Sequence, residues 1–106
     1  MAEGKFTVSL SMNVDLNTLF DQITNLVGTV IKPTGATSSS PNGNDRFVSL
    51  LGTDQVVAAY YHPDKYHYSR AQGKTDTNRS YAPAGKWAVA VAIRGLWGNK
   101  TWYGTD

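Results

Sequence analysis

The stretch that decides the fold is KWAVAVAIRGLW, residues 86–97. Large and small apolar side chains alternate along it: one face carries Trp87, Val89, Val91 and Ile93, and the other carries Ala88, Ala90 and Ala92. Because successive side chains of a strand point to opposite faces of a sheet, we expect a long central strand here. Its large face should lie in the core, and a second layer should cover its alanine face closely.

The residues that follow this strand predict a hairpin. Gly98-Asn99 suits a two-residue turn, which would pair Trp97 with Lys100. Trp102 would then lie on the same side as this pair, and Tyr103 would lie on the opposite side.

A second hairpin is predicted upstream. In His62-Pro63-Asp64-Lys65, proline and aspartate occupy the two central positions that suit a type I turn. With two residues in the loop, Tyr61 would face Tyr66 across the strands. One face of this hairpin would then carry three tyrosines and an arginine: Tyr61, Tyr66, Tyr68 and Arg70.

The segment before this hairpin predicts two further strands. Residues 46–51 and 54–62 are apolar runs on either side of Gly52-Thr53, which suits a tight connection. Residues 33–45 and 73–83 have turn composition and no apolar periodicity, so both are expected to be loops, the first of them flexible.

The N-terminal segment predicts a strand and then a helix. Apolar and polar residues alternate strictly from Lys5 to Val14, as in a half-buried strand. Asp15 suits a helix N-cap and Gly28 a C-cap. Between them, apolar residues recur at helical spacing: Leu16, Leu19, Phe20, Ile23 and Val27. We expect this amphipathic helix to pack on the sheet.

Together these elements predict one mainly β domain over residues 1–106. We expect an antiparallel β-sandwich or curled sheet of about six strands, with one short helix near the N-terminus.

The composition limits the classes of function. Only 17% of the residues are charged, and the net charge of +2 comes without a run of Lys or Arg, so nucleic-acid binding is permitted but not indicated. The chain has no cysteine and no apolar run long enough to span a membrane. Residues 1–4 show no signal peptide, and either none is used or one has been removed. The hydroxyl-rich composition favours an extracellular or particle-associated protein.

No constellation of residues predicts catalysis, a metal or a cofactor. His62 and His67 with Asp64 come closest to a metal site, but zinc needs three or four ligands, so we interpret the two as surface histidines. No nucleophile motif or phosphate-binding loop occurs, and most acidic residues fall in solvated turn, loop or cap positions. A non-enzymatic binding protein is therefore predicted.

Aromatic side chains with polar tips are the best candidates for recognition, because they give a large contact area at low entropic cost. The candidate binding residues lie in the two predicted hairpins: Tyr61, Tyr66, Tyr68, Arg70, Trp97, Lys100, Trp102 and Tyr103.

The order of residues from Ala59 to Tyr103 resembles a known family. It contains Ala59-Tyr60, then Lys65, His67 and Ser69, then the motif AGKWAVA at residues 84–90, and a closing Trp102-Tyr103. This pattern is similar to the lactococcin 972 bacteriocin family. The resemblance implies a small, secreted, cysteine-free β-sandwich that forms homodimers. It also implies inhibition of bacterial cell-wall synthesis at the septum through binding of the precursor lipid II.

Two other classes of function remain open. A self-assembling structural protein of a virion or cell surface would use the low charge and the small alanine face for subunit packing. A glycan or single-stranded nucleic-acid binding module would use Tyr66, Tyr68 and Arg70 as a stacking platform. Self-association as a homodimer or larger assembly is expected in the bacteriocin and structural cases.

Overall fold

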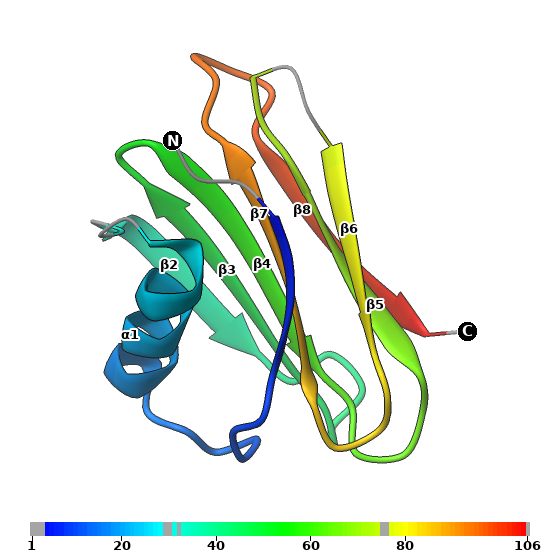
Figure 1. Cartoon of the computed structure of the whole chain (residues 1–106). Helices are drawn as coiled ribbons and strands as arrows, with labels where there is room; N and C mark the ends of the chain where they lie inside the picture. Colours follow the sequence, from blue (N-terminus) through cyan, green and yellow to red (C-terminus); the bar gives the residue numbers. More distant parts are fainter. Residues whose placement is uncertain (1–3, 29–30, 32, 75–76, 106) are drawn as a thin grey trace.

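The computed structural model describes residues 4–28, 31, 33–74 and 77–105, which form eight strands and one helix (Figure 1). One antiparallel sheet has the order β1-β7-β4-β3-β2. Its strands are β1 (Gly4–Val8), β7 (Trp87–Ile93), β4 (Gln55–Tyr61), β3 (Arg46–Gly52) and β2 (Pro33–Ser39). The second antiparallel sheet has the order β6-β5-β8. Its strands are β6 (Thr77–Ala82), β5 (His67–Gln72) and β8 (Lys100–Thr105).

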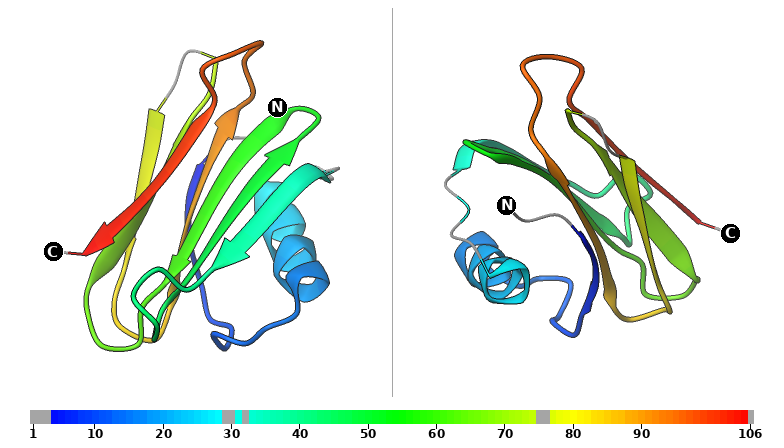
Figure 2. Two further views of the ribbon diagram at one scale, coloured as in Figure 1. Left: turned by 180° about the vertical axis from the view of Figure 1, so that it is seen from behind. Right: turned by 45° about the horizontal axis from the view of Figure 1, so that its top comes forward.

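The elements form three layers. The helix α1 (Leu16–Val27) covers one face of the five-stranded sheet, and the three-stranded sheet covers the other face (Figure 2). The predicted antiparallel β-sandwich with one short helix is therefore confirmed, with eight strands where about six were expected.

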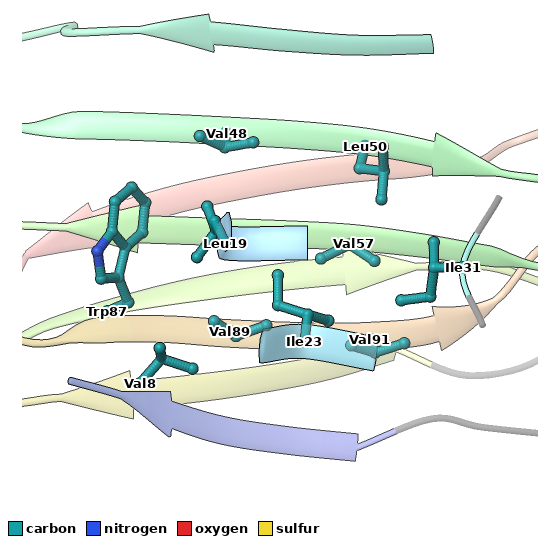
Figure 3. Close-up of a cluster of buried hydrophobic side chains, with 11 residues drawn as sticks. Val8, Leu19, Ile23, Ile31, Val48, Leu50, Val57, Trp87, Val89 and Val91 are labelled. Atoms are coloured by element: carbon teal, nitrogen blue, oxygen red, sulfur yellow. The ribbon is translucent and has the colours of Figure 1, made fainter. Parts of the chain in front are cut away.

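Strand β7 lies between β1 and β4, and its two faces differ as predicted. The large face points toward the helix, where Trp87, Val89 and Val91 pack with Leu19 and Ile23 (Figure 3). All five side chains are fully buried. This cluster is the main hydrophobic core of the protein.

The small face of β7 points toward the three-stranded sheet. Ala90 and Ala92 pack there against Ala71 of β5, with Val56 and Ala58 of β4 beside them. The hydroxyl of Ser69 donates a hydrogen bond to the carbonyl oxygen of Ala88 across the layers, at 2.8 Å. Small side chains thus let the second sheet approach closely enough for hydroxyl groups to bond to the backbone of the first.

The helix begins and ends as the sequence predicts. Leu19 and Ile23 are buried in the core, and Gly28 adopts a left-handed conformation with a φ of 80°. Its N–H donates to the carbonyl of Thr24 at 2.9 Å, which closes the last turn. Asp15 occupies the N-cap position without a side-chain capping bond. No helix within the described residues is long and apolar enough to cross a membrane.

Three predicted boundaries were wrong. Residues 33–39 form strand β2, paired with β3, and not a loop; only residues 40–45 connect the strands. Residues 77–82 form strand β6 instead of continuing the predicted loop. Both segments lie at sheet edges, where polar residues are tolerated and apolar periodicity is weak. Strand β1 ends at Val8 and not at Val14.

Neither predicted aromatic hairpin exists. Both edges of β4 are occupied, by β3 and β7, so the chain crosses after Tyr61 into the other sheet, where β5 lies. Both edges of β7 are likewise occupied, by β1 and β4, so β8 pairs with β5. Residues 62–66 and 94–99 are therefore connections between layers. The hairpin predicted between residues 46–51 and 54–62 is confirmed as β3 and β4.

Candidate functional site

The outer face of the three-stranded sheet carries a continuous group of aromatic and basic side chains. Along β5, His67, Ser69 and Ala71 are buried, so Tyr68 and Arg70 point outward. The register places Tyr81 and Arg79 of β6 on one side of them and Trp102 of β8 on the other. We call this group the aromatic–cationic face: Tyr66, Tyr68, Arg70, Arg79, Tyr81 and Trp102.

The side chains of this face contact one another in a row. The rings of Tyr66 and Tyr81 stack with centroids 5.6 Å apart and an angle of 13° between their planes. Tyr81 also contacts Tyr68, at 5.7 Å between centroids. The guanidinium carbon of Arg79 lies 4.5 Å from the centre of the Tyr68 ring. These contacts constrain the directions of the rings.

A second cation–π pair extends the row across β5. The guanidinium carbon of Arg70 lies 4.5 Å from the centre of the Trp102 ring, and the two residues are paired in the register. Beyond this pair, Gln72 faces Lys100, which is exposed at the end of the face. Positively charged groups and aromatic rings therefore lie side by side on this face of the sheet.

A glycine makes room for Tyr68. Gly104 lies opposite Tyr68 in the register, and a Cβ atom at this position would come within 2.5 Å of the tyrosine ring and hydroxyl. The outer end of the Tyr68 ring thus covers Gly104, as aromatic residues do when they lie over a glycine in a sheet. A larger residue here would lift the ring out of the row.

Five of the eight predicted binding residues belong to this surface or its end. The structure brings together Tyr66, Tyr68, Arg70 and Trp102, with Lys100 beside them. These residues come together because the outward side chains of β5 recur every second residue and because its partner β8 supplies Trp102.

Three predicted binding residues lie elsewhere. Tyr61 is in the five-stranded sheet and packs against Trp87 on the helix side, with ring centroids 5.6 Å apart. Tyr103 points between the sheets, where its ring contacts Phe47 at 4.7 Å. Trp97 is exposed in the connection between β7 and β8. The assumed hairpin registers placed these residues wrongly.

Two residues of the face, Arg79 and Tyr81, were missed because residues 73–83 were interpreted as a loop. The sequence did contain a pattern that indicates this strand. In residues 77–82, TNRSYA, larger outward residues alternate with small or polar inward ones, and Ser80 and Ala82 are buried. The alternation is weaker than in β7 because the inward residues are not large and apolar.

The two histidines are buried, so their interpretation as surface residues was wrong. His62 is 6% exposed and His67 is fully buried, with ring centroids 6.3 Å apart. Nδ1 of His62 accepts hydrogen bonds from the backbone N–H groups of Asp64 and Lys65, which shapes the crossing between sheets. Among the described residues, no group of three His, Asp or Glu side chains is placed to hold a metal ion.

The ring of Tyr60 contacts both histidines, and its hydroxyl bonds to a buried carboxylate, Asp45. The Tyr60 hydroxyl and the Asn42 side-chain amide both donate hydrogen bonds to Asp45. Burial alone would raise the pKa of Asp45, but the hydrogen bonds from Tyr60 and Asn42 outweigh it and lower the pKa below its usual value. Burial and the Asp45 carboxylate raise the pKa of Tyr60 well above its usual value. The hydrogen bond between Tyr60 and Asp45 links residues 40–45 to strand β4.

The family model for the bacteriocin lactococcin 972 matches residues 49–103, more than half of the chain. The chain belongs to this family. The match confirms the resemblance noted over residues 59–103, and extends it into β3. The search of curated proteins and the search of solved structures gave no significant match.

The part matched to the lactococcin 972 family contains the whole aromatic–cationic face. It begins within β3 and ends within β8, so it includes β4, β5, β6 and β7. The strands β1 and β2 and the helix α1 lie outside it. In this chain they complete the edges of the five-stranded sheet and cover its outer side.

Proposed function

We propose that the protein is a secreted, non-enzymatic bacteriocin that acts on a component of the bacterial cell envelope. Its target is a lipid-linked cell-wall precursor of the lipid II type, bound by the aromatic–cationic face. The observation that carries the proposal is the row of mutually supported rings and guanidinium groups on one exposed sheet, within the family-matched part of the chain.

The chemistry of the face suits such a precursor. Aromatic rings stack on the apolar faces of sugars, and guanidinium groups donate hydrogen bonds to phosphate oxygens. Tyr66 is 51% exposed and Tyr81 39% exposed, so part of each ring is open to a ligand. Arg70 and Lys100 add positive charge along the same surface. A sugar diphosphate contains both a sugar ring for the aromatic residues and phosphate oxygens for the basic ones.

Growth inhibition tests this proposal. Purified protein should inhibit some Gram-positive strains, and the double variant Tyr66→Ala with Tyr68→Ala should lose the activity. Leu26→Ala is a matched control, because Leu26 is 40% exposed on the helix, away from the face. It should retain activity. If no strain in a broad panel is inhibited, or if the double variant stays active, the proposal is wrong.

A glycan or single-stranded nucleic-acid ligand is the second candidate, because the same rings could stack on free sugars or bases. Salt dependence separates these ligands. Binding of an oligonucleotide should weaken steeply between low and moderate salt, whereas stacking on a neutral oligosaccharide should change little. Tight oligonucleotide binding by a protein without antibacterial activity would favour this candidate.

Self-association is part of the proposal, with a homodimer as the expected form. Within the described part of the chain, no strand pairs with the outer edge of β2, and every residue of β2 is exposed. Such an edge can pair with a second chain. Light scattering over a range of concentrations should show a dimer, and a monomer at the highest concentration would contradict this.

A further inference from the structure

The connection between β7 and β8, residues 94–99, presents two large apolar side chains to solvent. Leu96 is 92% exposed and Trp97 is 81% exposed, the largest exposures among the large apolar residues that the structure describes. The connection projects beyond the strands at one end of the sandwich (Figures 1 and 2). Exposure of a Leu-Trp pair at a projecting tip costs free energy unless something covers it.

The tip is held in place by its own hydrogen bonds. The Asn99 side chain accepts from the Gly95 N–H at 2.8 Å and donates to the Gly95 carbonyl at 3.0 Å. The Gln72 side chain donates to the carbonyl of Gly98 at 3.1 Å, and Gly98 has a φ of 75° that favours glycine. Leu96 and Trp97 are therefore presented to solvent by a loop whose conformation is held by these hydrogen bonds.

Basic residues surround the tip. Lys74 and Arg94 line an open hollow of about 700 Å³ together with Leu96 and Trp97, and Lys100 follows the loop. Arg94 is anchored there by a hydrogen bond from its guanidinium to the carbonyl of Gly52 at 2.9 Å. Asp54, in the neighbouring turn, is an acidic residue near this group, since its carbonyl oxygen accepts from the Arg94 N–H. Among the described residues, the side chains that line the hollow include two cations and no acidic group.

We infer that this tip docks on an anionic phospholipid surface. Tryptophan and leucine are suited to the boundary between headgroups and acyl chains, and nearby Lys and Arg side chains are attracted to anionic headgroups. The tip lies at the end of the three-stranded sheet where Gln72 pairs with Lys100. When the tip is docked, the aromatic–cationic face would therefore extend away from the membrane surface. The inference does not depend on the proposed target, because it concerns lipid alone.

Vesicles that contain no cell-wall precursor test the inference. The protein should co-sediment with phosphatidylcholine–phosphatidylglycerol vesicles, and much less with phosphatidylcholine vesicles. Raised salt should weaken the binding. Brominated lipid should quench Trp97 fluorescence, and Trp97→Phe should remove most of the quenching. Leu96→Ser with Trp97→Ser should weaken binding at least about tenfold, since it removes two buried apolar groups from the bound state.

Leu26→Ser is the matched control, since Leu26 is an exposed leucine on the helix. It should bind anionic vesicles as the unchanged protein does. Far-UV circular dichroism of each variant shows whether it is folded. If the unchanged protein binds no anionic vesicle, or if the folded tip variant binds as well as the control, the inference is wrong. Either result leaves the precursor proposal standing, because that proposal concerns another surface.

Discussion

The contact of Tyr68 with Gly104 shows how one small residue positions a candidate binding residue. A methyl group on Gly104 would collide with the far end of the Tyr68 side chain, which can move, so the sheet should survive while the ring is displaced. The contacts of Tyr81 and of Arg79 with Tyr68 depend on the position of this ring. Sequence alone could not predict the contact, because it depends on the register between β5 and β8.

The variant Gly104→Ala should therefore disturb the face without unfolding the protein. In the unchanged protein, the ring current of Tyr68 should shift the Gly104 Hα resonances, and Tyr68→Ala should abolish the shift. Gly104→Ala should move the side-chain resonances of Tyr68 and Arg79. Gly35→Ala is the control, since a Cβ atom there meets nothing within 4 Å. Unchanged Tyr68 resonances in Gly104→Ala would contradict the described packing.

A second prediction at this scale concerns acid stability. The folded protein lowers the pKa of Asp45, so this carboxylate stabilises the fold above its unfolded pKa of about 3.9. The contribution is lost as the pH falls through the lower pKa of the folded state. Asp45→Asn should reduce the free energy of unfolding by about 1–3 kcal/mol at neutral pH, and less in acid.

Urea denaturation at several pH values measures this difference. The exposed Asp21 on the helix provides the control, and Asp21→Asn should change the free energy of unfolding by less than about 0.5 kcal/mol. A difference between the unchanged protein and Asp45→Asn that stays constant from neutral pH to acid would argue against the stabilising role of the charge.

At the scale of elements, β7 was predicted well because its signal is local. The alternation of large and small side chains in WAVAVAI identifies a strand with two different buried faces, whatever its partners are. The partners of a strand are set by contacts far apart in the sequence. The two aromatic hairpins were therefore mispredicted, since sequence does not show that both edges of β4 and of β7 are already occupied.

The small face of β7 yields a prediction of its own. Ala90 is fully buried between the sheets, where extra volume has no room, so Ala90→Val should destabilise the protein by about 1–3 kcal/mol. Ala36→Val makes the same change at an exposed position of β2 and should have little effect. Thermal unfolding followed by circular dichroism compares them. Equal midpoints would mean that the two sheets do not pack closely at Ala90.

At the scale of the whole molecule, the family-matched part and the N-terminal segment share one core. Leu19 and Ile23 of the helix lie outside the match, yet they pack on Val89 and Trp87 inside it. Leu19→Ala should therefore lower the free energy of unfolding by about 2–5 kcal/mol, and Leu26→Ala by far less. A single denaturation transition is expected. Similar stability of the two variants would show that the helix contributes little to the fold.

The most direct test of the central claim is calorimetric titration with the soluble sugar–diphosphate–peptide head group of the precursor. The unchanged protein should bind it saturably. Tyr68→Ala should weaken the affinity by about 30-fold, as expected for a central aromatic residue of an interface. Leu96→Ser should bind normally, because the head group carries no lipid. No binding by the unchanged protein, or equal affinity in folded Tyr68→Ala, would contradict the assignment of the aromatic–cationic face.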